Sequence, residues 1–110
     1  MKALVVVDGG ICGFQTRIHV DSDDSQNVTF KIASGCEKAQ KFGEALIAKG
    51  LVDGYAEIGA GADGVVLSIA RENLKGCCAA CAVPVGAFKA MQVAAGVALP
   101  KDVALKISSE

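Results

Sequence analysis

Two segments of alternating side chains constrain the fold of this chain more than any other feature. In residues 14–20 and again in residues 28–32, side chains that suit a core alternate with polar ones. A period of two is typical of a strand with one buried face. The polar, acidic stretch 21–27 between them predicts a loop, so the two segments should form an antiparallel hairpin. The same alternation favours Phe14 as a core side chain.

Two further segments have strand character. Residues 3–7 are a short apolar run, which predicts a strand buried on both faces. After Pro100, apolar and other residues alternate again over residues 103–107, which predicts a last strand. The sheet should therefore contain the hairpin and at least one strand from each end of the sequence.

A helix is expected directly after the hairpin. Ser34 and Glu37 have the spacing of a capping box, with Ser34 as the N-cap. An apolar stripe at helical spacing follows, and Gly50 supplies the left-handed residue that ends it. Cys36 then lies in the first turn of this helix. There, free N–H groups and the positive end of the helix dipole stabilise a thiolate.

Two more helices are expected later in the chain. Residues 65–74 predict a helix capped by Asp63, although the run 65–69 also suits a strand. Pro84 favours the first position of another helix, where its missing N–H costs nothing, and Gly96 closes that helix. The predicted class is α+β, a small antiparallel sheet with about three helices on one face. Residues 1–110 should form a single domain, since 110 residues have room for only one.

The composition argues against several classes of partner. The chain carries 11 basic and 12 acidic residues, interleaved along the sequence, for a net charge of −1. This balance offers no basic patch for nucleic acid or for an anionic membrane. Because we see neither a signal-peptide core nor the roughly 20 apolar residues of a membrane span, we expect a cytoplasmic protein. Thiols stay reduced in that compartment.

The five cysteines carry the main functional signal. Four of them lie at junctions between predicted elements: Cys12, Cys36, Cys78 and Cys81. The pair Cys78 and Cys81 has the two-residue gap that lets one turn present both sulfurs to a single ion. With thiolates from two other loops, the set would be tetrahedral and all-sulfur, which suits zinc or an iron–sulfur cluster. The alternative is that these are buried, inert thiols.

Cys77 is the cysteine that we leave out of the site. It is adjacent to Cys78, and neighbouring residues in a turn seldom both point at one ion. The sequence therefore predicts four metal ligands and one bystander thiol, and it does not distinguish zinc from a cluster.

The cysteine pattern resembles that of the NifU/IscU-type iron–sulfur scaffold proteins over roughly residues 10–96. It carries Gly10-Ile11-Cys12-Gly13 before an alternating hairpin, Ser34-Gly35-Cys36 at a helix start, and a last cysteine before an Ala-rich helix. It is also similar to small TSCPD-type domains, which share the first two cysteine positions and a later one. The resemblance implies that Cys12, Cys36 and Cys81 are ligands. It also implies partners among proteins of metal or cluster handling.

The chain departs from the scaffold pattern at two places. Phe14 stands where the scaffold family has an Asp, and Ala80 stands where it has a His. Both groups are linked in that family to a labile, transferable cluster. With Cys78 as a fourth thiolate instead, this chain should hold its metal more tightly, which puts a transfer role in doubt.

The other motifs in the sequence favour structural roles over binding or catalysis. Residues 59–64 match GxGxxG but lack the acidic residue about 20 positions later that a dinucleotide site needs, so a loop is favoured. His19 is expected on the exposed strand face. The acidic residues at 21, 23 and 24 lack the Gly and final Glu of a calcium loop and predict a turn.

Three functions remain in view. The leading one is a metal- or cluster-binding protein without catalysis of its own. The second is a thiol–disulfide oxidoreductase that uses Cys78 and Cys81. The third is an interaction module in which zinc is purely structural.

Overall fold

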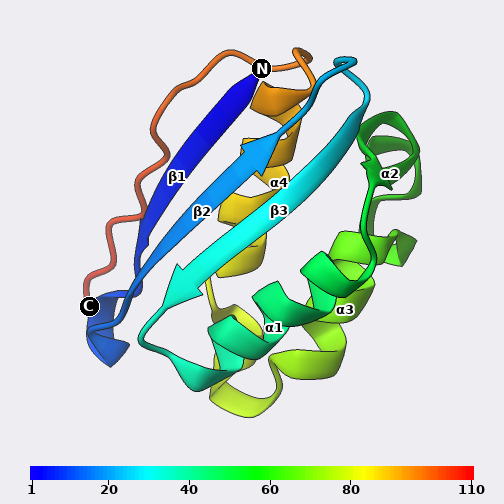
Figure 1. Ribbon diagram of the computed structural model, residues 1–110. Coiled ribbons are helices and arrows are strands. Elements are labelled where there is room, and N and C mark those ends of the chain that lie inside the picture. The colour runs from blue at the N-terminus through cyan, green and yellow to red at the C-terminus, as the bar shows by residue number, and fades with distance from the viewer.

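The computed structural model describes residues 1–110 as a four-stranded antiparallel sheet with helices on one face (Figure 1). The strands are Lys2–Asp8 (β1), Gln15–Asp21 (β2), Asn27–Ser34 (β3) and Val52–Asp53 (β4). The α-helices are Glu37–Ala48 (α1), Gly54–Ala60 (α2), Val65–Asn73 (α3) and Val83–Ala94 (α4). Three short 3₁₀ turns are Gly10–Cys12 (η1), Gly61–Asp63 (η2) and Gly76–Ala80 (η3). The predicted α+β class is confirmed, with four α-helices where about three were expected.

The strands lie in the sheet in chain order, each antiparallel to the next. Ile18 in the middle of β2 is paired with Val5 on one side and Ile32 on the other. The alternation in β2 and β3 is confirmed, because their core-type side chains are buried while the intervening ones face solvent. Thr16 is the polar exception, and its hydroxyl lies 2.8 Å from that of Ser34.

Helices cover one face of this sheet. α4 lies over β1 and β2, α1 lies over β3, and α3 packs against both helices. Two glycines let the layers approach closely. A Cβ at Gly86 would stand 2.7 Å from Val7 Cγ2, and one at Gly43 would stand 2.7 Å from Ile32 Cβ. Because real side chains do not tolerate such contacts, glycine is required at both places for this packing.

The first strand differs from the prediction. Residues 3–7 were expected to be buried on both faces, yet Leu4 is 49% and Val6 is 44% exposed. The reason is that helices cover only one face of the sheet, so Leu4 and Val6, which point to the other face, stay exposed. An uninterrupted apolar run therefore does not establish that both faces of a strand are covered.

The helix boundaries also need correction. The N-cap of α1 is Cys36 and not Ser34, which is the last residue of β3 and accepts a hydrogen bond from the Cys36 N–H at 3.1 Å. Residues 65–74 do form a helix and not a strand, but its N-cap is Gly64 rather than Asp63. The sequence pattern did not reveal β4 or α2, since both are short.

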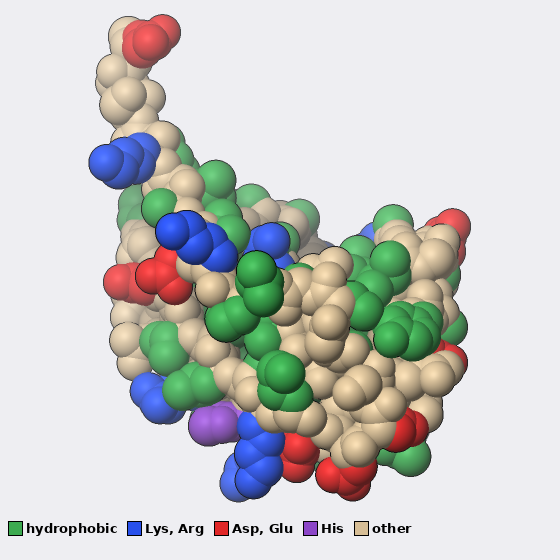
Figure 2. Space-filling view, turned by 90° about the horizontal axis from the view of Figure 1, so that it is seen from above, with side chains coloured by type: hydrophobic (Ala, Val, Ile, Leu, Met, Phe, Trp, Pro, Cys, Tyr) green, Lys and Arg blue, Asp and Glu red, His purple; other side chains and the backbone are tan.

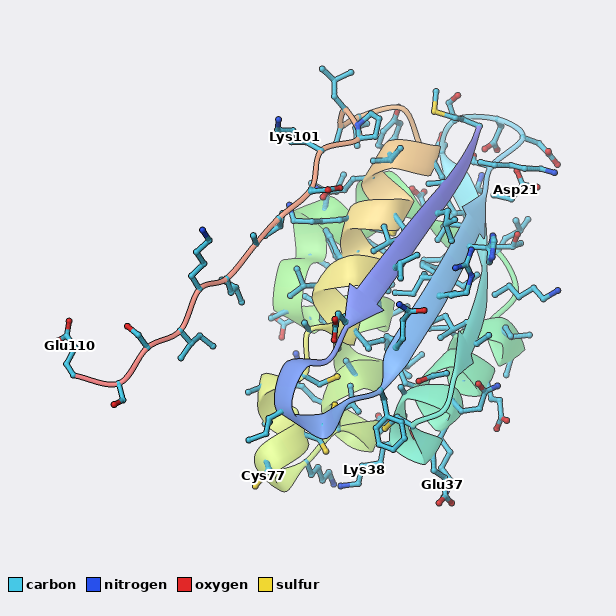
Figure 3. The ribbon with its side chains drawn as sticks, turned by 90° about the vertical axis from the view of Figure 1, so that its left-hand side faces the viewer. Asp21, Glu37, Lys38, Cys77, Lys101 and Glu110 are labelled. Atoms are coloured by element: carbon cyan, nitrogen blue, oxygen red, sulfur yellow. The ribbon has the colours of Figure 1, made fainter.

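The predicted strand over residues 103–107 is wrong. Residues 97–110 have no regular structure and no strand partner, and every residue from 96 to 110 is exposed. Figure 3 shows this segment leaving the body near Lys101 and running out to Glu110. Alternation alone could not supply a pairing partner, and within one copy of this protein the segment has none.

One stretch passes the length and composition test for a membrane span, contrary to the expectation from the sequence. Gly76–Ala94 has 19 residues and a mean hydropathy of 1.5. In this fold the stretch comprises η3 and α4, and α4 is the central core helix over β1 and β2. A core helix passes the same test, so the feature is weak evidence for a membrane.

Candidate metal centre

Cys12 lies in η1, the tight connection between β1 and β2. Gly10 and Gly13 both have φ of +75°, a conformation that other residues rarely adopt, and this tightens the turn. The Cys12 thiol folds back and donates a hydrogen bond to the Gly9 carbonyl oxygen at 3.6 Å. The residue is exposed, so its sulfur is accessible from solvent.

Cys36 lies at the start of α1 with extended backbone angles, φ −81° and ψ 121°. It is half-buried and packs against the core. The Phe14 ring lies beside Gly35, the residue before Cys36, because a Cβ on Gly35 would stand 3.3 Å from Phe14 Cδ1. Phe14 is 45% exposed and precedes β2, so the prediction of a core side chain at this position is wrong.

Cys78 and Cys81 belong to one turn before α4. The Cys81 N–H donates to the Cys78 carbonyl oxygen at 3.1 Å, and both residues are half-buried against the core. The Lys38 ammonium reaches the Lys75 carbonyl oxygen at 3.5 Å, which ties this segment to the start of α1. The start of α1 and the turn before α4 therefore lie side by side. Figure 1 shows η1 at the same end of the molecule.

The pKa of the Cys81 thiol indicates which other thiols lie near it. Burial raises the pKa of the Cys81 thiol, and the charges of Cys36, Cys12 and Cys78 raise this pKa further. A backbone hydrogen bond from Val83 acts in the opposite direction. Charges act on one another in this way only at short range. Cys81 therefore lies within the range of such charge interactions, about 10 Å, of all three other predicted ligands.

Cys77 is placed differently. It is exposed, and its charge is not among those that act on Cys81. Figure 3 shows it at the outer margin of the molecule, beyond the other sulfur atoms at that end. This arrangement agrees with the expectation that Cys77 faces away from the other thiols.

The thiols are gathered but are not in coordination geometry. All five cysteines are free, and no three His, Cys, Asp or Glu side chains are spaced to hold a metal ion. Zinc–sulfur bonds of about 2.3 Å would require the sulfurs to move closer together. Three of them lie in or next to the 3₁₀ turns η1 and η3, where small movements do not disturb the sheet.

The glycine-rich run 59–64 has a structural explanation instead of a ligand. It spans the end of α2, η2 and the N-cap of α3, with no strand directly before it. The buried Glu57 carboxylate accepts hydrogen bonds from the N–H groups of Val65 at 2.9 Å and Val66 at 2.6 Å. A Cβ on Gly64 would stand 2.8 Å from Glu57 Oε2. Glu57 thus caps α3, a role that the sequence analysis missed because the two segments are eight residues apart.

The remaining polar candidates have no neighbours that suggest a site. His19 is exposed on the open face of the sheet, opposite Leu4 and Lys31. Hydrogen bonds from the side chain and N–H of Asn27 and the N–H of Gln26 lower the pKa of Asp24 from 3.8 to about 2. The acidic stretch 21–27 is therefore a hydrogen-bonded turn, as predicted.

A cavity lies away from the cysteines, between two of the helices. It has a volume of about 300 Å³ and is lined by residues of α1 and α3, together with the segment just before α3. No cysteine lines it. No nucleophile and base among its residues form a catalytic pair, so it does not compete with the thiol cluster as a candidate site.

Fold and site together define a small α+β protein with a group of four thiols at one end of the sheet. The chain belongs to the family described as "Family of unknown function (DUF6951)", whose model matches residues 3–107. Searches of the curated proteins and of the solved structures found no match. The likeness to the iron–sulfur scaffold proteins stays a prediction.

Proposed function

We propose that this protein binds one metal ion or iron–sulfur cluster through Cys12, Cys36, Cys78 and Cys81. The observation that carries the proposal is that the charges of the other three thiols act on Cys81. Two of these thiols, Cys12 and Cys36, come from segments far from Cys81 in the sequence. Thiols that served only as small core side chains would have no reason to gather at one end of the molecule.

The donor set suits zinc or an iron–sulfur cluster. Four thiolates match the sulfur-rich, tetrahedral surroundings that both prefer. Without an ion, burial in the first place and the neighbouring thiol charges in the second disfavour the Cys81 thiolate, and both raise its pKa. A bound cation reverses this balance. It attracts each thiolate, and this attraction outweighs the repulsion between the thiolates.

Partner proteins of metal or cluster handling are part of the proposal. The exposed side chains of Ile11 and Phe14 flank Cys12, which is the most open of the proposed ligands. Apolar side chains exposed beside a site are a suitable surface for a protein that delivers or receives the ion. We place the protein in the cytoplasm, where reduced thiols are available for metal.

The oxidoreductase alternative has less support. An attacking cysteine needs a lowered pKa, so that its thiolate is populated at neutral pH. Burial instead raises the pKa of Cys81. This alternative also gives no role to Cys12 and Cys36.

Anaerobic purification followed by an absorption spectrum and metal and sulfide analysis tests the proposal. A brown protein with iron and sulfide identifies a cluster, and a colourless protein with one zinc per chain identifies the ion. A chain that retains neither, and that takes up neither zinc nor a reconstituted cluster, contradicts the proposal. Iodoacetamide labelling provides a second readout, since bound thiols are protected while Cys77 reacts.

A further inference from the structure

The segment after α4 has the pattern of a strand but no partner. Val103, Leu105 and Ile107 are 60%, 80% and 92% exposed, and the residues between them are small or polar. Figure 2 shows the segment as an arm standing clear of the body. Isolated exposed apolar side chains are common, but three in strict alternation on an extended segment indicate a surface meant to be covered.

The way this segment leaves α4 is fixed by local structure. Gly96 has φ of +78°, its N–H donates to the Val93 carbonyl, and the Val97 N–H donates to the Gln92 carbonyl, each at 3.0 Å. This pair of bonds is the Schellman motif. Pro100 then restricts the backbone on both sides of it. The first residues of the arm thus have a defined conformation, and Figures 2 and 3 show the rest of the segment leaving the body.

A free sheet edge is available on the same molecule. β1 pairs only with β2, so the backbone groups on its other side have no partner. On the helix face, Ala3 and Val5 are only half-buried, because no further strand lies beside them. Such an edge invites pairing with another extended segment.

We infer that residues 102–108 of one copy of this protein pair with the free edge of β1 in a second copy, and that the exchange is reciprocal. The two copies then form a dimer related by a two-fold axis, each supplying a fifth strand to the other. The lengths agree, because β1 has seven residues and residues 102–108 are equal in number.

The chemistry of the segment suits this place in the sheet. In a strand, Val103, Leu105 and Ile107 all fall on one face, and Asp102, Lys106 and Ser108 fall on the other. The apolar row would lie on the helix face beside Ala3 and Val5 and would extend the core. The polar row would continue the open face, where β2 and β3 also present polar side chains. The family match runs through residue 107 and therefore includes this segment except Ser108.

Light scattering on the full chain during size-exclusion chromatography tests the inference. The wild type should have twice the mass of one chain, and Leu105→Asp should reduce it to that of a monomer. Ala104→Asp is the matched control, because it adds the same charge on the other face of the strand and should leave the dimer intact. Both residues are exposed within one copy, so neither change should prevent folding.

A second measurement distinguishes exchange between copies from folding back within one copy. In a mixture of isotope-labelled and unlabelled chains, isotope-filtered NMR should detect contacts of residues 103–107 with β1 between the two kinds of chain. A wild-type monomer, a dimer that Leu105→Asp does not weaken, or contacts only within one copy would each overturn the inference.

Discussion

The Cys12 sulfur occupies the space that a side chain on Gly9 would need. A Cβ at Gly9 would stand 2.5 Å from Cys12 Sγ and 3.0 Å from the Phe14 carbonyl oxygen. Gly9 has φ of −73°, an ordinary value, so glycine is required here by the lack of space, chiefly beside the thiol, and not by a left-handed backbone conformation. The connection between β1 and β2 is therefore built around the position of the Cys12 sulfur.

Gly9→Ala should displace this sulfur and lower the amount of metal or cluster bound per chain. Overpacking of this kind destabilises a protein by about 1–3 kcal/mol. Metal analysis and urea unfolding on the same samples measure both effects. Gly59→Ala is the control, because a Cβ there meets nothing within 4 Å and a helical Gly→Ala change stabilises by about 0.5–1 kcal/mol. Full metal content in the Gly9→Ala variant would show that the packing of this turn does not affect metal binding.

Cys77→Ser should leave metal content near that of the wild type, whereas Cys78→Ser should reduce it. Cys78 is half-buried and its charge acts on Cys81, while Cys77 is exposed. The ratio of metal to protein in the two variants decides between the neighbours. A loss in Cys77→Ser alone would show that the wrong cysteine has been assigned to the site.

Phe14→Asp should make the bound ion or cluster easier to remove. The ring lies beside Gly35, next to Cys36, so a carboxylate at this position could compete with a thiolate as a ligand. Oxygen is a poorer partner than sulfur for zinc or iron in such sites. Release to a chelator should be faster from the variant, and Gln15→Asp, which adds the same charge on the exposed side of β2, should not change it. Equal release rates would show that position 14 does not reach the metal.

Glu57→Ala should lower the free energy of unfolding by about 1–3 kcal/mol, since it leaves the N–H groups of Val65 and Val66 without their acceptor. Glu44→Ala, an exposed change on α1, should stay within about 0.5 kcal/mol of the wild type. Urea unfolding monitored by circular dichroism measures both. Similar values for the two variants would contradict the capping role of Glu57.

Stability should fall between about pH 4 and pH 2, in part through Asp24. Its pKa is lowered from 3.8 to about 2 in the folded chain by hydrogen bonds from Asn27 and Gln26. A lowered pKa means that the carboxylate stabilises the fold above pH 3.8 and that this contribution disappears as the pH falls toward 2. Asp24→Asn should therefore flatten the pH dependence of the melting temperature in this range. An unchanged slope would refute this role for Asp24.

The sequence alone determined the hairpin and the fold class, and it supplied the four cysteines of the proposed site. Alternation over β2 and β3 predicted their buried faces, because strand periodicity is a local property of the backbone. Gly50 and Gly96 marked helix ends, because the left-handed conformation that both adopt is also a local property of the backbone. The cysteines were identified by their places at element junctions, which also depend only on local pattern.

The tertiary structure decided which distant residues lie next to each other, because a local sequence pattern carries no information on such contacts. Residues 3–7 and residues 103–107 both suit strands, yet one became a half-exposed edge and the other found no partner within its own chain. Phe14 followed the alternation but lies on Gly35, because β2 begins only at Gln15, after the turn at Gly13. Glu57 caps a helix eight residues away. Each outcome depends on contacts across the chain, and only the packed molecule brings these groups together.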